Sequence, residues 1–130
     1  MPLSRIPLQR DRIIIRRIGV FAYHGVYDEE ARLGQRFNIT LECWLDLAEA
    51  GKTDDLTKGV SYADLAALVQ EIAVSERFKL IETLGERIAE AILAQHPRIQ
   101  DTCVTVEKPH AAIAALFETV EVAIHRRRAT

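Results

Sequence analysis

The amino-acid sequence predicts an α+β domain in which a four-stranded, mainly antiparallel sheet carries two helices on one face, in the order ββααββ. Three observations lead to this prediction. Residues 37–47 alternate strictly between apolar and polar side chains, which is the period of a strand with one buried face. Residues 62–77 and 82–95 each place apolar side chains along a single helical stripe. The 130 residues suit one domain with one core, in which such helices bury their stripes against a neighbouring layer.

Residue type supports the alternation in the predicted strands. Residues 11–23 are rich in β-branched and aromatic side chains, and we expect this first strand to bend around Gly19. The second strand, residues 37–47, places Cys43 on its apolar face, where we expect a buried structural thiol. The last two strands are predicted at residues 102–108 and 117–125.

Start and stop signals delimit the two helices. Ser61 stands three residues before Asp64, close to a capping-box pattern, and Pro97 follows the second helix. Between the second strand and the first helix, residues 48–59 contain two glycines and two adjacent aspartates, which predicts a loop. The acidic residues 26–34 are likewise expected to form a turn.

We expect one domain over residues 11–126, with a mobile N-terminal extension at residues 1–10 and a basic tail at residues 127–130. The arginines at both ends are expected to be solvated, and we assign them no function. A sheet of four strands leaves unpaired backbone groups at its two edges, and such edges favour pairing with other subunits. A closed ring of identical subunits would satisfy them, so a homo-oligomer is expected.

Composition limits the partners and the compartment. The formal net charge is −2 and the pI is near 6.1, so neither nucleic acid nor an anionic membrane is an expected partner. No apolar run approaches the ~20 residues that span a bilayer, and the start of the sequence has no apolar signal-peptide region. Cys43 and Cys103 lack metal-motif spacing and are expected to be reduced. We therefore expect a soluble, cytoplasmic protein.

Metal, hydrolase and nucleotide chemistry have no support among the motifs. The four histidines, at positions 24, 96, 110 and 125, form no H-x-H or H-x-x-x-H pair. The sequence contains no G-x-S-x-G elbow, no P-loop and no G-x-G-x-x-G turn. We therefore expect neither a metal nor a cofactor, and acid–base chemistry remains.

Four ionisable residues near the ends of predicted elements are candidates for that chemistry. Lys108 ends a strand, and the ring of the following proline fixes its extended geometry. Glu82 opens the second helix, Tyr62 lies in the first turn of the other, and Glu30 belongs to the acidic turn. Taken singly, each has a plainer explanation: an exposed lysine, an acid at a helix start, a packed tyrosine and a solvated glutamate. A metal-free acid–base enzyme and a binding domain both remain open.

Six short segments carry a family resemblance. They are Tyr23-His24-Gly25-Val26 followed by Glu30, Gly34-Gln35-Arg36-Phe37, Ala50-Gly51-Lys52-Thr53-Asp54-Asp55-Leu56, Val60-Ser61-Tyr62-Ala63, Leu80-Ile81-Glu82-Thr83-Leu84 and Val106-Glu107-Lys108-Pro109. In order and spacing they resemble the dihydroneopterin aldolases, over about residues 11–126. The resemblance implies the tunnelling fold, in which such sheets assemble into rings, a tetramer or an octamer, with active sites between subunits.

The resemblance also implies roles for individual residues. Glu82 corresponds to the family's pterin anchor, and main-chain groups near Val60 and Ile81 correspond to neighbouring ring contacts. Lys108 corresponds to the catalytic lysine, Tyr62 to a tyrosine that takes part in proton transfer, and Glu30 to a glutamate beside the substrate's side chain. The reaction implied is retro-aldol cleavage of 7,8-dihydroneopterin in folate biosynthesis, by an aldehyde-lyase that uses no metal, Schiff base or cofactor. We expect structural roles for the histidines at positions 24 and 110.

Two alternatives stay open at this point. An epimerase acting at the 2′ carbon of dihydroneopterin or its triphosphate would share these residues, because cleavage and re-addition in the opposite sense invert that carbon. A catalytically silent pterin-binding ring would keep Glu82 but would have no need for Lys108 and Tyr62. The joint presence of Lys108 and Tyr62 favours an enzyme.

Overall fold

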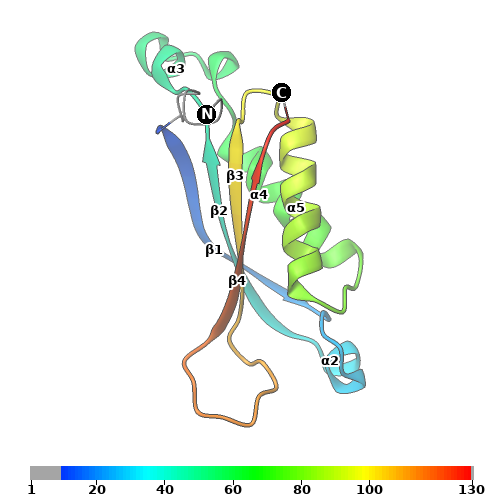
Figure 1. Ribbon diagram of the computed structural model, residues 1–130. Helices are drawn as coiled ribbons and strands as arrows, with labels where there is room; N and C mark the ends of the chain where they lie inside the picture. Colours follow the sequence, from blue (N-terminus) through cyan, green and yellow to red (C-terminus); the bar gives the residue numbers. More distant parts are fainter. Residues whose placement is uncertain (1–9, 130) are drawn as a thin grey trace.

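Four antiparallel strands form a single sheet in the computed structural model, which describes residues 10–129 (Figure 1). The strands are β1 (Arg12–Ala22), β2 (Gln35–Trp44), β3 (Asp101–Lys108) and β4 (Val120–Arg127), and they lie in the order β1-β2-β3-β4. The predicted four-stranded antiparallel sheet is therefore confirmed. Apart from Arg10, the predicted N-terminal extension lies outside the described residues.

Two long helices cover one face of the sheet and enclose the core. They are α4 (Tyr62–Ser75) and α5 (Ile81–Gln95), of which α4 packs mainly on β1 and α5 on β3 and β4. One hydrophobic cluster joins the inward side chains of the strands to both helical stripes. Cys43 is fully buried there, as predicted, and its burial raises the pKa of the thiol to about 11. The helical stripes thus pack against the sheet as their periodicity predicts.

Two segments predicted as irregular are short helices instead. Residues 26–34 contain α2 (Asp28–Leu33), and residues 48–59 contain α3 (Ala48–Thr53) and the 3₁₀ helix η1 (Leu56–Lys58). Carboxylate side chains cap the N-termini of two of these helices: Glu30 accepts a hydrogen bond from the Tyr27 N–H, and Asp55 accepts one from the Thr57 N–H. Helices of three to six residues are too short for a periodic apolar stripe, so only such local caps could have predicted them.

The bend in β1 is not at Gly19. The register with β2 shifts between Ile15 and Ile18, and Arg17 there has a φ of 55°. One extra residue in β1 at this point forms a bulge, while Gly19 keeps its regular pairing with Asn38. The pairing of two strands decides where a bulge occurs, and a single segment of sequence does not contain that information.

The predicted ends of several elements also shift. The pairing of β2 ends at Trp44 rather than at residue 47, α4 ends two residues before residue 77, and β4 begins at Val120 rather than at residue 117. Arg126 and Arg127 are exposed, as expected for the C-terminal arginines, but both also form ion pairs. Arg126 pairs with Glu86 of α5 at 2.6 Å, and Arg128 donates hydrogen bonds to carbonyls at the C-terminal end of α5. None of the helices in residues 10–129 is long and apolar enough to cross a membrane.

Candidate active site

A buried ion pair joins two of the predicted catalytic residues. Glu30 is the third residue of α2, and Lys108 is the last residue of β3. Lys108 Nζ lies 2.6 Å from Glu30 Oε2, and the two side chains are only 13% and 9% exposed. The exposed lysine and the solvated glutamate that each residue alone suggested are therefore wrong.

The surroundings of Glu30 favour its ionised form. Burial opposes ionisation, but the hydrogen bond from Lys108, the N–H of Tyr27 and the positive charge of Lys108 together lower the pKa of Glu30. The side-chain amide of Gln35 adds a further hydrogen bond at 3.2 Å. Gln35 Oε1 is buried and has no hydrogen-bond partner among the described residues.

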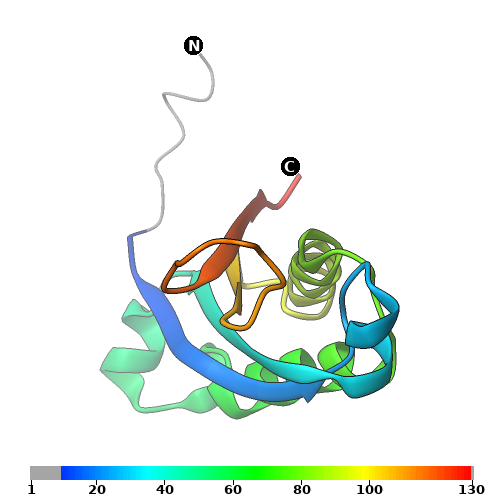
Figure 2. The same ribbon diagram turned by 90° about the horizontal axis from the view of Figure 1, so that it is seen from below.

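A pocket of about 240 Å³ opens beside the ion pair. Its walls come from the start of α2, the start of α5 and the chain that follows β3, three elements that meet at the lower end of the molecule in Figure 1 and face the viewer in Figure 2. The lining residues are Val26, Tyr27, Glu30, Lys79, Leu80, Ile81, Glu82, Lys108, Ala111, Ala112, Ile113, Val120 and Val122. Four predicted site residues, Glu30, Ile81, Glu82 and Lys108, thus share one pocket.

Glu82 lies at the positive end of α5, with an exposed side chain. Its carboxylate forms no hydrogen bond or ion pair with any other residue in the range 10–129, so both oxygens can accept hydrogen bonds from a ligand. The pocket therefore combines a carboxylate acceptor with an amine–carboxylate pair that can move a proton. These groups suit a site that binds a ring carrying several hydrogen-bond donors and removes a proton from a group attached to that ring.

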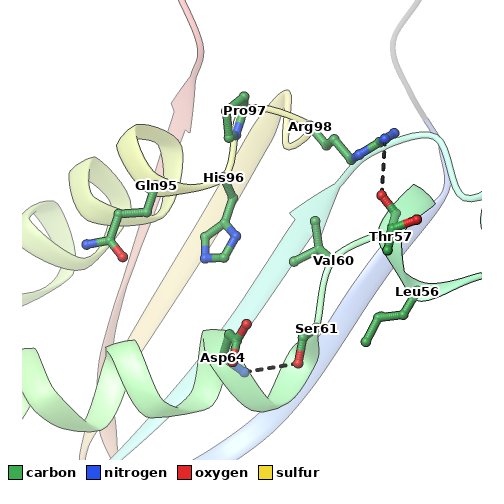
Figure 3. A pocket seen from close by; sticks show the side chains of 10 residues that line it. Leu56, Thr57, Val60, Ser61, Asp64, Gln95, His96, Pro97 and Arg98 are labelled. Atoms are coloured by element: carbon green, nitrogen blue, oxygen red, sulfur yellow. Dashed lines mark hydrogen bonds between the residues drawn. The ribbon is translucent and has the colours of Figure 1, made fainter.

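Val60 and Tyr62 do not line the ion-pair pocket. Val60 and Ser61 line a second pocket of about 490 Å³ between the start of α4 and the end of α5, where Gln95 and His96 form the opposite wall (Figure 3). Tyr62 is 69% exposed, so its predicted packing in the core is wrong. Because Glu82 and Gln95 mark opposite ends of α5, at about 1.5 Å per residue the two pockets are roughly 20 Å apart.

Three side chains at the ion-pair pocket were not identified as site residues from the sequence. Tyr27 and Lys79 line the pocket, and Gln35 contacts Glu30 directly. Gln35 lies within a segment that carries the family resemblance, and this was the available signal. The chemistry of Tyr27 and Lys79 only becomes visible once α2 and the start of α5 are placed side by side.

The histidines occupy different environments. His24 is fully buried and hydrogen-bonded at both ring nitrogens, which confirms its predicted structural role, whereas His110 is exposed. Burial lowers the pKa of His24, and the positive charges of Arg77 and Lys108 lower it further against the effect of its hydrogen bond to Ala73. Within residues 10–129, no three His, Cys, Asp or Glu side chains are grouped to hold a metal ion.

Comparison with known proteins identifies the family. Residues 13–125 match the family model FolB, described as dihydroneopterin aldolase. A dihydroneopterin aldolase of Methylorubrum extorquens is 53% identical over 118 residues, 91% of each chain.

Solved structures agree. A FolB protein of Vibrio cholerae superposes with a TM-score of 0.85 at 32% identity, over 93% of this chain and all of that one. The Escherichia coli dihydroneopterin aldolase in complex with neopterin has a TM-score of 0.82 at 33% identity, over 89% of this chain and 98% of that one. The fold is therefore the tunnelling fold of these proteins. Sequence, fold and the residues of the ion-pair pocket lead to the same conclusion: this chain belongs to the dihydroneopterin aldolase family.

Proposed function

We propose that this chain cleaves 7,8-dihydroneopterin by a retro-aldol reaction, to give 6-hydroxymethyl-7,8-dihydropterin and glycolaldehyde. The observation that carries the proposal is the buried pair of Lys108 and Glu30, 2.6 Å apart, in the same pocket as the unpaired carboxylate of Glu82. Glu82 accepts hydrogen bonds from the amino group and the N3–H of the pterin ring, and a bidentate, charge-assisted contact of this kind fixes the ring's orientation. The main chain at Ile81 supplies a neighbouring contact.

Lys108 acts as the base in this proposal. When bound substrate removes water from the pair, Lys108 transfers a proton to Glu30, 2.6 Å away, because desolvation disfavours two charged groups. The neutral amine takes the proton of the 2′-hydroxyl, the C1′–C2′ bond breaks, and its electrons flow through C6 to N5 of the ring. Protonation at C1′ then completes the hydroxymethyl product as glycolaldehyde leaves.

The substrate itself supports the proposal that no metal or cofactor takes part. The N5=C6 imine of the reduced pterin accepts the electrons of the broken bond, so the protein has only to bind, orient and move protons. The two cysteines are unpaired and Cys43 lies in the core, which suits a reducing compartment such as the cytoplasm.

A second copy of the chain completes the proposed site. Val60 and Tyr62 lie beside the C-terminal end of α5, whereas Glu82 lies at its N-terminal end, roughly 20 Å away. They therefore reach a pterin bound at Glu82 only from a neighbouring subunit. β1 and β4 are the two edges of the sheet, and joining β1 of one copy to β4 of the next closes a ring of four, alone or stacked as an octamer. The exposure of Tyr62 favours this arrangement, because a contact with a neighbour would cover it.

The test is direct. Purified protein is incubated with 7,8-dihydroneopterin in the presence of a chelator, and both products are followed by chromatography; we expect them in equal amounts. Lys108→Ala should lower the single-turnover rate by about 10²–10⁴-fold, as expected for loss of a general base. Lys52→Ala, an exposed lysine of α3, is the matched control and should leave the rate unchanged. An unchanged rate in Lys108→Ala would reject the assignment of the base.

A further inference from the structure

A set of buried contacts links the two walls of the ion-pair pocket, and His24 lies at its centre. Phe78 N–H donates to His24 Nδ1 at 3.0 Å, so the ring proton resides on Nε2, which donates to the carbonyl of Ala73 at 2.8 Å. The imidazole also stacks on the Phe78 ring, with centroids 5.4 Å apart and planes 18° apart. His24 is therefore held as one neutral tautomer in one orientation.

The residues beside His24 make the same connection through their main chains. Gly25 N–H donates to the Phe78 carbonyl at 3.0 Å. The guanidinium of Arg77 donates to the carbonyls of Tyr23, at 3.0 Å, and of Gly25. We name residues 23–25 and 77–78 the clamp. Its members come from two segments far apart in the sequence, the end of β1 and the α4–α5 connection.

Each arm of the clamp leads directly into the pocket. Beyond Gly25 the chain enters α2, which carries Glu30, and beyond Phe78 it continues to the start of α5, which carries Glu82. Glu30 packs so closely on Gly25 that a Cβ there would lie 2.2 Å from its carboxylate oxygen. The clamp therefore sets the separation between the carboxylate of the ion pair and the carboxylate at the start of α5.

We propose that His24 is a positioning residue of this site, which holds the Glu30 wall and the Glu82 wall in register by bonding to Phe78 and Ala73 at the same time. The inference rests on the proposed function for its consequence in catalysis. Histidine suits the task because one planar ring offers an acceptor and a donor in opposite directions. A protonated ring would turn a second N–H toward the Phe78 N–H, and it would add a positive charge near Arg77 and Lys108.

Two substitutions separate positioning from general stability. In His24→Asn, the amide oxygen can replace Nδ1 and keep the bond from Phe78, while the bond to Ala73 is lost. In His24→Gln, the amide nitrogen can replace Nε2 and keep the bond to Ala73, while the bond from Phe78 is lost. Both variants lose the stacked ring and one hydrogen bond, so their losses of stability should be similar.

The variants should differ in ligand binding. We expect the Kd for neopterin to rise about tenfold more in His24→Gln than in His24→Asn, because only the asparagine keeps the link to the start of α5, and small misplacements of site residues have large effects. Hydrogen exchange should likewise increase at amides 78–83 in His24→Gln and remain slow at the strand amides of β2 and β3. Equal changes in Kd for two variants of equal stability would overturn the proposal.

Arg77 provides a second measurement if neither histidine variant folds. Its side chain is exposed, so Arg77→Gln removes clamp contacts without altering the core, and it should raise the Kd for neopterin. Lys52→Gln is the control, because Lys52 is an exposed cation on α3, outside both the clamp and the sheet edges. An unchanged Kd in Arg77→Gln would also overturn the proposal. Failure of the proposed function is recognised separately, as a wild-type protein that binds neopterin but does not cleave 7,8-dihydroneopterin.

Discussion

Two inactive variants should restore activity to each other when they assemble together. The reason is the distance between the two pockets. Glu82 lies in the first turn of α5, while Gln95 at its other end lines the same pocket as Ser61, the residue next to Tyr62. The rise of about 1.5 Å per residue separates Tyr62 from Glu82 by roughly 20 Å within one chain. In the proposed site, the Tyr62 and the Lys108 that serve one substrate therefore come from different subunits.

The perturbation is the co-expression of Lys108→Ala and Tyr62→Ala chains that carry different affinity tags. Each variant alone should lose about 10²–10⁴-fold in single-turnover rate, because a group that transfers protons is missing from every site. In randomly mixed rings, a site is complete when the subunit that supplies Lys108 is a Tyr62→Ala chain and the subunit that supplies Tyr62 is a Lys108→Ala chain. Each condition is met with a probability of about one half, so about one quarter of the sites are complete. Mixed rings purified through both tags should therefore recover about one quarter of the wild-type sites.

A second mixture provides the control. A chain carrying both substitutions, mixed with wild-type chain, should retain about one quarter of the sites if each site spans two subunits, but about one half if each lies within one chain. Active sites are counted from the amplitude of a single turnover with 7,8-dihydroneopterin. If the Lys108→Ala and Tyr62→Ala mixture is no more active than either variant alone, the reasoning from the length of α5 is refuted.

Two further predictions concern stability. Gly25→Ala should lower the free energy of unfolding by about 1–3 kcal/mol in denaturant titrations, because φ is 150° there and the new Cβ would meet the carboxylate of the ion pair. The control Gly51→Ala, where no atom lies within 4 Å of the added Cβ, should be neutral or stabilising; equal losses in both would argue against the close contact. Burial, together with the charges of Arg77 and Lys108, lowers the pKa of His24 in the folded protein. As the pH falls, the unfolded chain therefore takes up a proton at His24 before the folded chain does. The contribution of His24 to stability should be fully present above about pH 6.5 and be lost as the pH falls below that value. His24→Asn should remove this part of the decline between pH 7.5 and 5.5, and an unchanged pH dependence in that variant would contradict the assignment.

The sequence predicted those parts of the fold that depend on long periodic patterns. The alternation through Phe37, Ile39 and Leu41 corresponds to fully buried side chains of β2, and the stripe that includes Leu84 and Ile88 corresponds to the buried face of α5. Such patterns were decisive because each repeats several times within one element. Apolar side chains recur about every 3.6 residues on the buried face of a helix and every second residue on that of a strand, so the two are easily distinguished. The short helices α2 and α3 contain too few turns for this signal.

The bulge in β1 needed information that a single segment does not contain. Gly19 is the residue with the greatest backbone freedom in the strand, yet the extra residue is accommodated at Arg17, which adopts a φ of 55°. There the Arg17 N–H donates to the side chain of Thr40 on β2 at 3.0 Å. The position of the irregularity thus follows from a contact across the sheet, whereas the conformational preference of one residue pointed elsewhere.

The candidate site was predictable as a set of residues but not as a geometry. Considered alone, Lys108 and Glu30 each had an ordinary explanation as surface charges, and only the fold brings them to 2.6 Å and buries them together. The resemblance assigned both residues to one active site in advance, because a family pattern relates distant segments, but it did not predict that they form an ion pair. A structural role was expected for His24 from the sequence, but its hydrogen bonds to Ala73 and Phe78 became apparent only from the fold.

The proposed division of the site between subunits would also account for exposed side chains that the isolated chain leaves unexplained. Tyr62 is 69% exposed, and Leu56 beside the second pocket is 66% exposed, although apolar surface of this kind is unfavourable in water. At the other end of the molecule, the ion-pair pocket is partly walled by exposed Ile113 of the β3–β4 loop. The proposed ring joins β1 of each subunit to β4 of its neighbour, so every subunit has another copy beside both edges of its sheet. We therefore infer that one set of contacts pairs the sheet edges, covers these apolar side chains and assembles the site, so that substitutions weakening the ring should lower activity even where they touch no substrate.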